Sequence, residues 1–352
     1  MTAPHSIALL RLSALGDVCH CIALVRSLQR RWPDAALTWV IDRACLRLVE
    51  ALPGVEFIVL DRRQGLIAQR RQLKRALAGR RLDVLLHAQV SLRANLLATA
   101  IRANRRIGFD AARSREGHGL VIDERIAEVP FQHQAEALLE FARVLDADPE
   151  GVDRAPPLAE ADRAWAAVQQ PEPGRAVLIS PCSSHPARDW SAEGYAAAAD
   201  WLIESAGRPV ILVGGPSARE HAMGQAIEAA MRNRPLNLIG HDTLGRLLAM
   251  LERAACLIAP DSGPVHFAAA LGTPVVGLYA STWSRRSGPL GSLEHCVDRF
   301  PEACRRLIGR EPEQVRWGKR IEQADVMALI EPENVAERLQ AVFDRSNVPG
   351  RQ

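Results

Sequence analysis

The stretch from residue 256 to residue 279 constrains the fold most strongly, and it reads CLIAPDSGPVHFAAALGTPVVGLY. Residues 256–259 and 274–279 are two apolar runs of strand length, and the pattern between them fits a short helix. Ser262 or Gly263 can cap that helix. Two strands joined by a helix form a βαβ unit, so this stretch predicts a parallel sheet.

The start of the predicted helix is a candidate ligand site, because its free N–H groups and positive dipole end face outward from the strand ends. A helix start of this kind attracts phosphate. Asp261, Ser262 and Gly263 form the turn, and His266 follows in the first helical turn. We interpret the turn as a nucleotide-diphosphate site in which Asp261 holds sugar hydroxyls. The alternative is an ordinary turn whose Asp261 and Ser262 only cap the helix.

The alternation of apolar runs and helical patterns continues along the whole chain of 352 residues, which is long for one core. The polar, proline-containing segment 146–157 is typical of a linker. We therefore predict an α/β fold with an N-terminal domain, 1–157, and a C-terminal domain, 158–330. Each would be a doubly wound, Rossmann-type domain, and the two would face a cleft. Residues 331–352 contain a last helix that could cross back to the N-terminal domain.

The composition disfavours several classes of protein. No run of about 18 apolar residues exists, so no membrane span is expected. The seven cysteines show no zinc spacing and no CxxC pair, as is typical of reduced cytosolic proteins. No GxGxxG follows a strand, which disfavours a nicotinamide dehydrogenase. Asp146 and Asp148 spell DxD inside the linker; we interpret them as a solvated acidic turn, and expect no catalytic metal and no cofactor.

The net charge of +3 conceals a strong asymmetry. Residues 62–115 contain 14 Lys or Arg against Asp83 and Asp110, a balance of +12, so the rest of the chain carries −9. A local excess of this size draws anions. No aromatic interleaving supports a nucleic-acid partner.

Asp17 closes the segment SALGD in the first strand-to-helix turn, which places its carboxylate at the carboxyl edge of a sheet. It could act as a general base for a hydroxyl nucleophile. Alternatively, it is a first-turn acid that complements the helix dipole. A helix start makes a carboxylate a weaker base, so the catalytic role requires that the proton move late, as the hydroxyl attacks.

Residues 180–190, SPCSSHPARDW, follow the first strand of the second half. Ser183 and Ser184 can donate to phosphate oxygens, and the planar fork of Arg188 can bind a diphosphate. Glu220, after a Gly-Gly-Pro turn, could bind a ribose hydroxyl. The alternatives are an ordinary loop with a solvated Arg188 and a solvated surface Glu220.

Three segments together resemble the lipopolysaccharide heptosyltransferases of glycosyltransferase family 9: residues 11–35, 180–190 and 259–279. Residues 87–95 and 106–110 are similar to the acceptor-side segments of that family. The resemblance implies a GT-B fold with the donor in the C-terminal domain and the acceptor in the N-terminal one. It also implies inverting, metal-independent transfer of heptose from ADP-heptose to the inner core, the Kdo–lipid A region, of lipopolysaccharide.

Carried over by motif, the resemblance makes Asp17 the catalytic base. It implies donor binding by Ser183, Ser184, Arg188, Glu220, Asp261, Ser262, Gly263 and His266. Arg188 stands where the family usually has lysine, and Ser262 stands where threonine is common. Candidates to hold an anionic acceptor are Arg62, Arg63, Arg105, Arg106 and Arg113.

The implied acceptor is anchored in a membrane that contains anionic lipid. The basic helix 65–78 could rest on that surface, which would make the protein cytoplasmic and peripheral to the inner membrane. Two alternatives remain open: a transferase of the same fold that uses a UDP- or GDP-sugar, and a nucleotide- or lipopolysaccharide-binding protein without turnover.

Overall fold

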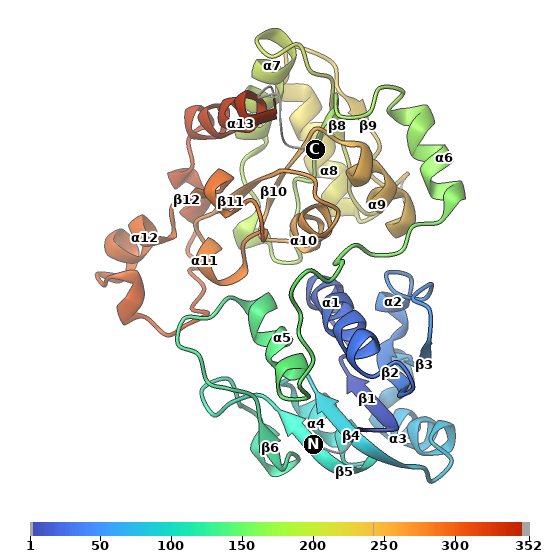
Figure 1. The fold of residues 1–352 in the computed structure, drawn as a ribbon. Helices are drawn as coiled ribbons and strands as arrows, with labels where there is room; N and C mark the ends of the chain where they lie inside the picture. The colour runs from blue at the N-terminus through green and yellow to red at the C-terminus, as the bar shows by residue number, and fades with distance from the viewer. Residues whose placement is uncertain (1–2, 242, 347–352) are drawn as a thin grey trace. The chain divides into compact units, whose positions relative to one another are not determined.

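The computed structural model describes residues 3–241 and 243–346, and the chain divides into two compact units, 1–157 and 158–352. The boundary falls at the end of the proline-containing segment in which the sequence places the linker. Each unit has its own sheet and helices, as the ribbon in Figure 1 shows. Each also has its own cluster of buried apolar side chains. The two units are described separately.

The first unit is built on a parallel sheet whose six strands, among the described residues, lie in the order β3-β2-β1-β4-β5-β6. The strands are β1 (Ser6–Leu10), β2 (Ala36–Asp42), β3 (Val55–Leu60), β4 (Arg81–His87), β5 (Arg102–Gly108) and β6 (Glu124–Arg125). The α-helices are α1 (Leu15–Arg31), α2 (Arg43–Leu46), α3 (Gly65–Ala76), α4 (Leu92–Ala98) and α5 (Gln134–Arg143). Four of the five residues of β1 are buried, as expected for a central parallel strand that is covered on both faces.

The second unit repeats this topology, with its six described strands in the order β12-β11-β10-β7-β8-β9. The strands are β7 (Val177–Ile179), β8 (Val210–Leu212), β9 (Leu236–Asn237), β10 (Cys256–Pro260), β11 (Val275–Tyr279) and β12 (Val297–Asp298). The α-helices are α6 (Glu160–Gln169), α7 (Ala192–Glu204), α8 (Ala218–Ala230), α9 (Leu244–Arg253), α10 (Gly263–Ala270), α11 (Ser284–Ser287), α12 (Phe300–Ala303) and α13 (Pro332–Ser346). Counted from its own first strand, each sheet therefore has the order 3-2-1-4-5-6. The predicted doubly wound α/β class is confirmed.

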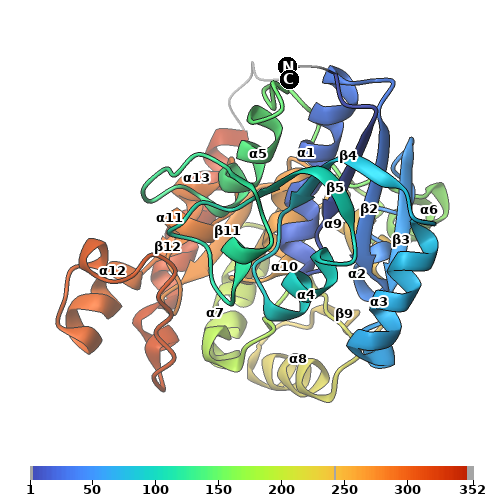
Figure 2. The same ribbon diagram turned by 90° about the horizontal axis from the view of Figure 1, so that it is seen from below.

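Two helices differ from the sequence prediction. Helix α5, which the sequence analysis does not predict, packs along α1, and the two views in Figures 1 and 2 show them side by side. Helix α13 buries Val335, Leu339 and Val342 in the core of the second unit and packs on α7. The apolar residues that suggested a helix packing on the N-terminal domain are thus used within the C-terminal unit.

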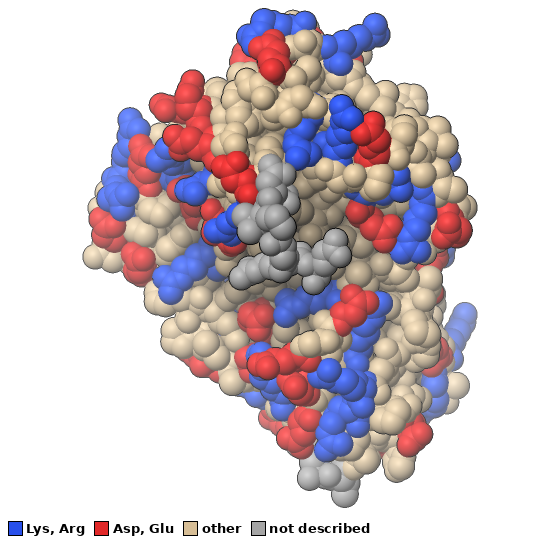
Figure 3. Space-filling model, turned by 45° about the horizontal axis from the view of Figure 1, so that its top comes forward, with Lys and Arg blue, Asp and Glu red and all other residues tan. Residues whose placement is uncertain are grey.

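Four further observations concern membrane spans, metal ligands, cysteines and surface charge. Among the described residues, no helix combines the length and apolarity that a membrane span requires. Within the same residues, no group of three or more His, Cys, Asp or Glu is placed to hold a metal ion. All seven cysteines are free thiols and buried. On the face drawn in Figure 3, Lys and Arg lie interspersed with Asp and Glu.

Candidate active site

The candidate residues follow the carboxyl ends of strands in both sheets. In the first unit, Asp17 follows β1, which lies beside β4 where the strand order reverses. In the second unit, Arg188 follows β7 and Asp261 follows β10, and these two strands occupy the equivalent reversal. Ligands of open α/β sheets bind at such points.

The carboxylate of Asp17 is held from both sides. Arg11, at the end of β1, donates to Oδ2 and forms an ion pair with it, and Gln134 of α5 donates to Oδ1. Another nitrogen of Arg11 donates to the backbone carbonyl of Ala88 at 2.5 Å. The Asp17 side chain is 15% exposed. A carboxylate has about four acceptor positions, so these two contacts orient Asp17 and leave lone pairs for a further hydrogen bond.

A glutamine fixes the turn that leads to Asp17. Oε1 of Gln89, which follows β4, accepts hydrogen bonds from the backbone N–H groups of Leu12 at 2.7 Å and Ser13 at 3.2 Å. No side chain caps the start of α1. The first N–H groups of this helix and the Arg11 guanidinium therefore make a positive environment around Asp17.

A buried histidine pair lies under the same sheet edge. His87, the last residue of β4, and His118 both contact Oδ1 of Asn95, at 2.9 and 3.1 Å. Nε2 of His118 accepts from the backbone N–H of Phe109 at 3.0 Å, which places the proton of a neutral His118 on Nδ1. Burial, with His118 and nearby arginines adding to it, lowers the pKa of His87 to about 3. Burial and then Arg125 lower the pKa of His118 to about 4.

The turn before α10 matches the predicted βαβ unit closely. Ser262 is the N-cap residue, Pro264 lies at the helix start, and Gly272, with φ +79°, closes the unit. The side chain of Ser262 makes no capping hydrogen bond. Its Oγ is buried and has no hydrogen-bond partner among the described residues. The capping alternative therefore does not account for the Ser262 hydroxyl.

Arg188 and Asp261 form one cluster. A guanidinium nitrogen of Arg188 lies 3.6 Å from Asp261 Oδ2 and donates to the Asp261 backbone carbonyl at 3.2 Å. Ser287 donates to the same Oδ2 at 3.4 Å. Arg188 is 11% exposed, and burial lowers its pKa. Its Nε is buried without a hydrogen-bond partner among the described residues. Thus Arg188 is not the solvated loop residue of the alternative interpretation.

The two serines in the loop after β7 have different surroundings. Ser183 is buried, and its hydroxyl donates to the carbonyl of His185 at 2.8 Å and accepts from the N–H of the same residue at 3.0 Å. Arg219 bridges the carbonyl of Ser183 and the carboxylate of Asp189. Ser184 is exposed. Ser183 therefore shapes the loop, and Ser184 presents its hydroxyl to solvent.

Glu220 holds the turn that follows β8. Its Oε1 accepts from the backbone N–H of Gly215 at 2.8 Å, and its Oε2 accepts from the Ser217 hydroxyl at 2.6 Å. Ser217 in turn caps α8 by accepting from the N–H of Glu220 at 3.3 Å. The glutamate thus stabilises a turn at the same carboxyl edge as Asp261. His266 lies on α10, partly buried.

Two of the arginines predicted to hold an acceptor lie within β5. The guanidinium of Arg106 donates to three backbone carbonyls, those of Val121 at 2.9 Å, Ile101 at 2.7 Å and Ala98 at 2.8 Å. Burial lowers its pKa. Arg105 forms a two-point pair with Glu124, both distances being 2.7 Å. These two side chains have strong intramolecular partners.

The other three lie after the strand ends. Arg113 pairs with Asp110 and donates to Gln132 at 3.0 Å. Arg63 pairs with Asp61 at 2.8 Å. Arg62 is exposed, and no hydrogen bond or ion pair joins its side chain to another described residue.

A pocket at the β11 and β12 end of the second sheet was not found by sequence reasoning. Asp261 and Ser287 line it together with Trp283 and four cationic side chains, those of Arg286, Arg316, Lys319 and Arg320. The signal was present in the sequence as basic residues alternating with tryptophan, WSRR at 283–286 and RWGKR at 316–320. Residues 62–115, where most of the excess positive charge lies, show no such alternation.

Comparisons with solved structures agree with the fold. The glycosyltransferase family 9 crystal structure from Veillonella parvula superposes with a TM-score of 0.79 at 22% identity, covering 97% of this chain and 98% of that one. The structure of E. coli ADP-heptose lps heptosyltransferase II gives 0.72 at 22% identity, covering 97% and 100%. Two doubly wound α/β units and these structural likenesses show a fold of the GT-B-like class.

Sequence comparison then gives the family. The profile of glycosyltransferase family 9 (heptosyltransferase) matches residues 70–311. The lipopolysaccharide core heptosyltransferase OpsX of Haemophilus influenzae is 32% identical over 341 residues, 95% of each chain. The lipopolysaccharide heptosyltransferase 2 of Salmonella typhimurium is 27% identical over 300 residues, 79% of this chain and 83% of that one. This chain belongs to glycosyltransferase family 9, the heptosyltransferases.

Proposed function

We propose that this enzyme transfers heptose from ADP-heptose to the inner core of lipopolysaccharide, with the second unit binding the donor and the first unit binding the acceptor. The observation that carries the donor assignment is the cluster at the start of α10. There, Ser262 Oγ and Arg188 Nε are buried polar atoms without hydrogen-bond partners among the described residues, beside an uncapped helix start. Diphosphate oxygens are acceptors that would satisfy both atoms and the helix N–H groups.

The proposed reaction is a single displacement. The acceptor hydroxyl gives its proton to Asp17 as its oxygen forms a bond to the anomeric carbon. The bond from that carbon to the diphosphate oxygen breaks, and ADP leaves with the electron pair. Because attack and departure occur on opposite faces of the carbon, the configuration inverts. Arg188 and the positive end of α10 stabilise the charge on the leaving diphosphate, so no metal is required.

The assignment of Asp17 as base is compatible with its contacts. Arg11 and Gln134 hold both oxygens, which fixes the direction of the remaining lone pairs. In this proposal the carboxylate accepts the proton late, when bond formation to the anomeric carbon has made the attacking hydroxyl acidic. Orientation and late proton transfer are therefore the two properties that the site provides.

The remaining donor residues act around the diphosphate in this proposal. Ser184 presents its hydroxyl to the phosphates, while Ser183 maintains the loop. Glu220 holds the turn after β8, where a ribose would be bound. Asp261 accepts hydrogen bonds from sugar hydroxyls, with Gly263 allowing close approach and His266 adding a polar group on α10.

The acceptor and the membrane are assigned to the first unit. We propose that Arg62, Arg63, Arg105, Arg106 and Arg113 supply its positive field. Helix α3 exposes Ile67, 69% accessible, on the same helical face as Arg71, Lys74 and Arg75. An apolar residue among cations suits peripheral binding to an anionic lipid surface. We therefore propose a location on the cytoplasmic face of the inner membrane.

Mass spectrometry of acceptors incubated with ADP-heptose tests the function directly. Kdo–lipid A acceptors lacking the first or the second heptose are each incubated with donor and enzyme, and the expected result is a mass increase of one heptose on one of them. An unchanged mass on every acceptor would reject the transfer.

A different nucleotide sugar is the second candidate, because the diphosphate-type cluster of Ser262, Arg188 and the start of α10 would suit any nucleoside diphosphate. Titration with ADP, UDP and GDP separates the two. Tighter binding of ADP supports the proposal, whereas tighter binding of UDP or GDP changes the donor and keeps the reaction class.

A further inference from the structure

The residues at the carboxyl edge of the second sheet lie in a defined spatial order. In spatial order, the residues that follow the strand ends are Phe300 after β12, Trp283 after β11, Asp261 after β10, Arg188 after β7 and Glu220 after β8. The diphosphate-type turn lies in the middle of this edge, at β10 and β7. The pocket lies to one side, at β11 and β12, and the turn held by Glu220 lies to the other side.

The wall of the pocket is aromatic. Trp283 stacks on Phe300, with ring centroids 5.6 Å apart and planes inclined by 19°. Trp317 meets Trp283 edge to face at 5.6 Å. Aromatic side chains beside polar groups are typical of the lining of small-ligand sites.

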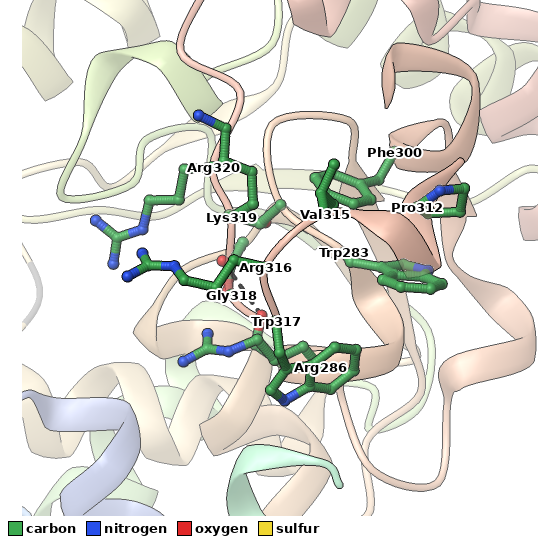
Figure 4. A pocket seen from close by; sticks show the side chains of 13 residues that line it. Trp283, Arg286, Phe300, Pro312, Val315, Arg316, Trp317, Gly318, Lys319 and Arg320 are labelled. Carbon is green, nitrogen blue, oxygen red and sulfur yellow. Dashed lines mark hydrogen bonds between the residues drawn. The ribbon is translucent and has the colours of Figure 1, made fainter. Parts of the chain in front are cut away.

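The remaining lining is strongly cationic. Figure 4 shows the side chains of Arg286, Arg316 and Arg320 extending toward the same side of the pocket. Lys319 adds a fourth cation, and the only carboxylate among the described lining residues is Asp261, which is already paired with Arg188. No ion pair or side-chain hydrogen bond engages Arg316, Lys319 or Arg320 among the described residues. Three cations held together without counter-charges favour an anionic ligand.

The backbone is adapted to this arrangement. Gly318 has φ +81°, a conformation that residues with a side chain rarely adopt. A Cβ at this position would lie 2.8 Å from Nε of Arg286. The glycine therefore allows the segment 316–320 to pack directly on Arg286, and this contact brings cations from two segments of the chain into one pocket.

We propose that the pocket formed by Arg286, Arg316, Lys319 and Arg320 binds an oxyanion, a carboxylate or a phosphate, carried by the acceptor sugar, so that the donor unit also recognises the acceptor. This inference rests on the proposed function. The class of ligand is an acidic sugar: the tryptophan wall contacts its ring and the cations contact its charged group.

The position along the edge distinguishes acceptor from donor. In the proposed function, ribose is assigned to the Glu220 side and diphosphate to the middle of the edge. The pocket is on the opposite side of Asp261 from Glu220. Because Asp261 is proposed to hold the transferred sugar, a ligand in this pocket would lie on the sugar side of the diphosphate and not on the nucleoside side. A charged group of the donor nucleotide has no reason to extend there.

The test compares two triple variants of the full chain. The pocket variant is Arg316→Gln/Lys319→Gln/Arg320→Gln. The matched control is Arg305→Gln/Arg306→Gln/Arg310→Gln, which removes the same charge from exposed residues that do not line the pocket. Wild type and both variants are titrated with free Kdo, inorganic phosphate and ADP at constant ionic strength, and circular dichroism verifies that each is folded.

We expect the Kd for Kdo, for phosphate or for both to rise at least about tenfold in the pocket variant only, with less than a threefold change for ADP. Kdo and phosphate as separate probes identify which oxyanion is bound. Equal weakening of ADP would assign the pocket to the donor and overturn the proposal. Absence of Kdo and phosphate binding in the wild type, or an equal loss in the control, would also overturn it.

These titrations require no turnover, so the two hypotheses fail separately. Loss of Kdo or phosphate binding in the pocket variant, combined with no heptose transfer to any acceptor, would retain the pocket and reject the function. Heptose transfer combined with unchanged binding and an unchanged acceptor KM in the pocket variant would retain the function and reject the pocket.

Discussion

The two units have the same strand order but place different chemistry at the equivalent reversal. Each presents one carboxylate there with an arginine partner: Asp17 with Arg11 in the first unit, Asp261 with Arg188 in the second. Arg11 contacts Asp17 directly, and Gln134 also donates to the Asp17 carboxylate. Arg188 and Asp261 are 3.6 Å apart. In the second pair, Nε of Arg188 is buried and has no hydrogen-bond partner in the described part of the chain.

In the proposed function, this difference separates a reacting group from a binding site. A carboxylate whose oxygens are both held is fixed in one direction, which suits proton transfer to a positioned atom. A looser pair with unsatisfied donors has remaining capacity for ligand oxygens. One doubly wound topology therefore supports two tasks, and the residues of the turns rather than the strands decide which.

Replacement of the two carboxylates should have the largest effects, and it tests whether Asp17 and Asp261 have different roles. Asp17→Asn should lower kcat by about 10²–10⁴-fold, because the amide cannot accept the proton. Its Kd for ADP should remain within twofold of wild type. Asp261→Asn should instead weaken ADP-heptose binding. Steady-state kinetics and calorimetric titration measure both. Asp153→Asn, at an exposed carboxylate of the first unit, is the control.

Retained turnover in Asp17→Asn would remove the distinction between the carboxylates. It would leave Asp17 as a first-turn acid that complements the dipole of α1.

Substitution of Arg188 tests how the second unit binds the donor diphosphate. Arg188→Gln should raise the Kd for ADP by about 10- to 100-fold, because a hydrogen bond to a charged group contributes about 1.5–3 kcal/mol. Arg188→Lys should have a smaller effect, since the charge is kept and the planar fork is lost. Titration of ADP against each variant gives the difference, with Arg175→Gln as a control. Equal losses in Lys and Gln variants would show that geometry, not charge, binds the diphosphate.

The sequence predicted those parts of the site that local chain geometry determines. Asp17, Arg188 and Asp261 each follow an apolar run of strand length, so their place at a carboxyl edge was readable from pattern alone. Gln134 was not, because 117 residues separate it from Asp17 and only the packing of α5 on α1 brings them together. The pocket around Trp283 was missed for the same reason, since it joins segments after two different strands.

Helix α13 illustrates the limit of periodicity. Its apolar positions correctly predicted a helix, but periodicity gives a face and not the surface that covers it. The spacing of Val335 and Leu339 would be the same whether the helix packed on the first core or on the second. Arg106 is a second example: its charge suggested a ligand, and the three carbonyls that it binds become neighbours only when β5 and α4 are folded.

A fall in pH should lower the stability of the first unit and raise that of the second. The buried His87 and His118 have lowered pKa values, about 3 and about 4, against an ordinary 6.5. The unfolded chain therefore binds more protons below pH 6.5. This contribution to stability is complete above pH 6.5 and falls as the pH drops, by up to about 1.4 kcal/mol per pH unit for each histidine.

Burial raises the pKa of Asp298 in the second unit above its ordinary 3.8, so the folded state binds the extra proton there. Its contribution is present below the unfolded pKa and is lost as the pH rises through the folded one. Amide hydrogen exchange at pH 7 and 5, resolved by peptide, should show that acid weakens protection of β4 more than that of β12. His118→Gln should reduce that difference, and Asp298→Asn should flatten the pH dependence near β12. An equal loss of amide protection in β4 and β12 at pH 5 would contradict these opposite pKa shifts.

The smallest expected effects compare arginines within the first unit. Arg62 has no side-chain partner among the described residues, whereas Arg106 binds three backbone carbonyls, so the two should differ in kind. Arg62→Gln should raise the acceptor KM by about two- to fivefold with an unchanged melting temperature, as expected for one exposed charge. Arg106→Gln should lower the free energy of unfolding by about 1–3 kcal/mol, because buried carbonyls lose their donors. Kinetics with the Kdo–lipid A acceptor and thermal denaturation separate the two outcomes. A raised KM without destabilisation in Arg106→Gln would assign its guanidinium to the acceptor instead of the fold.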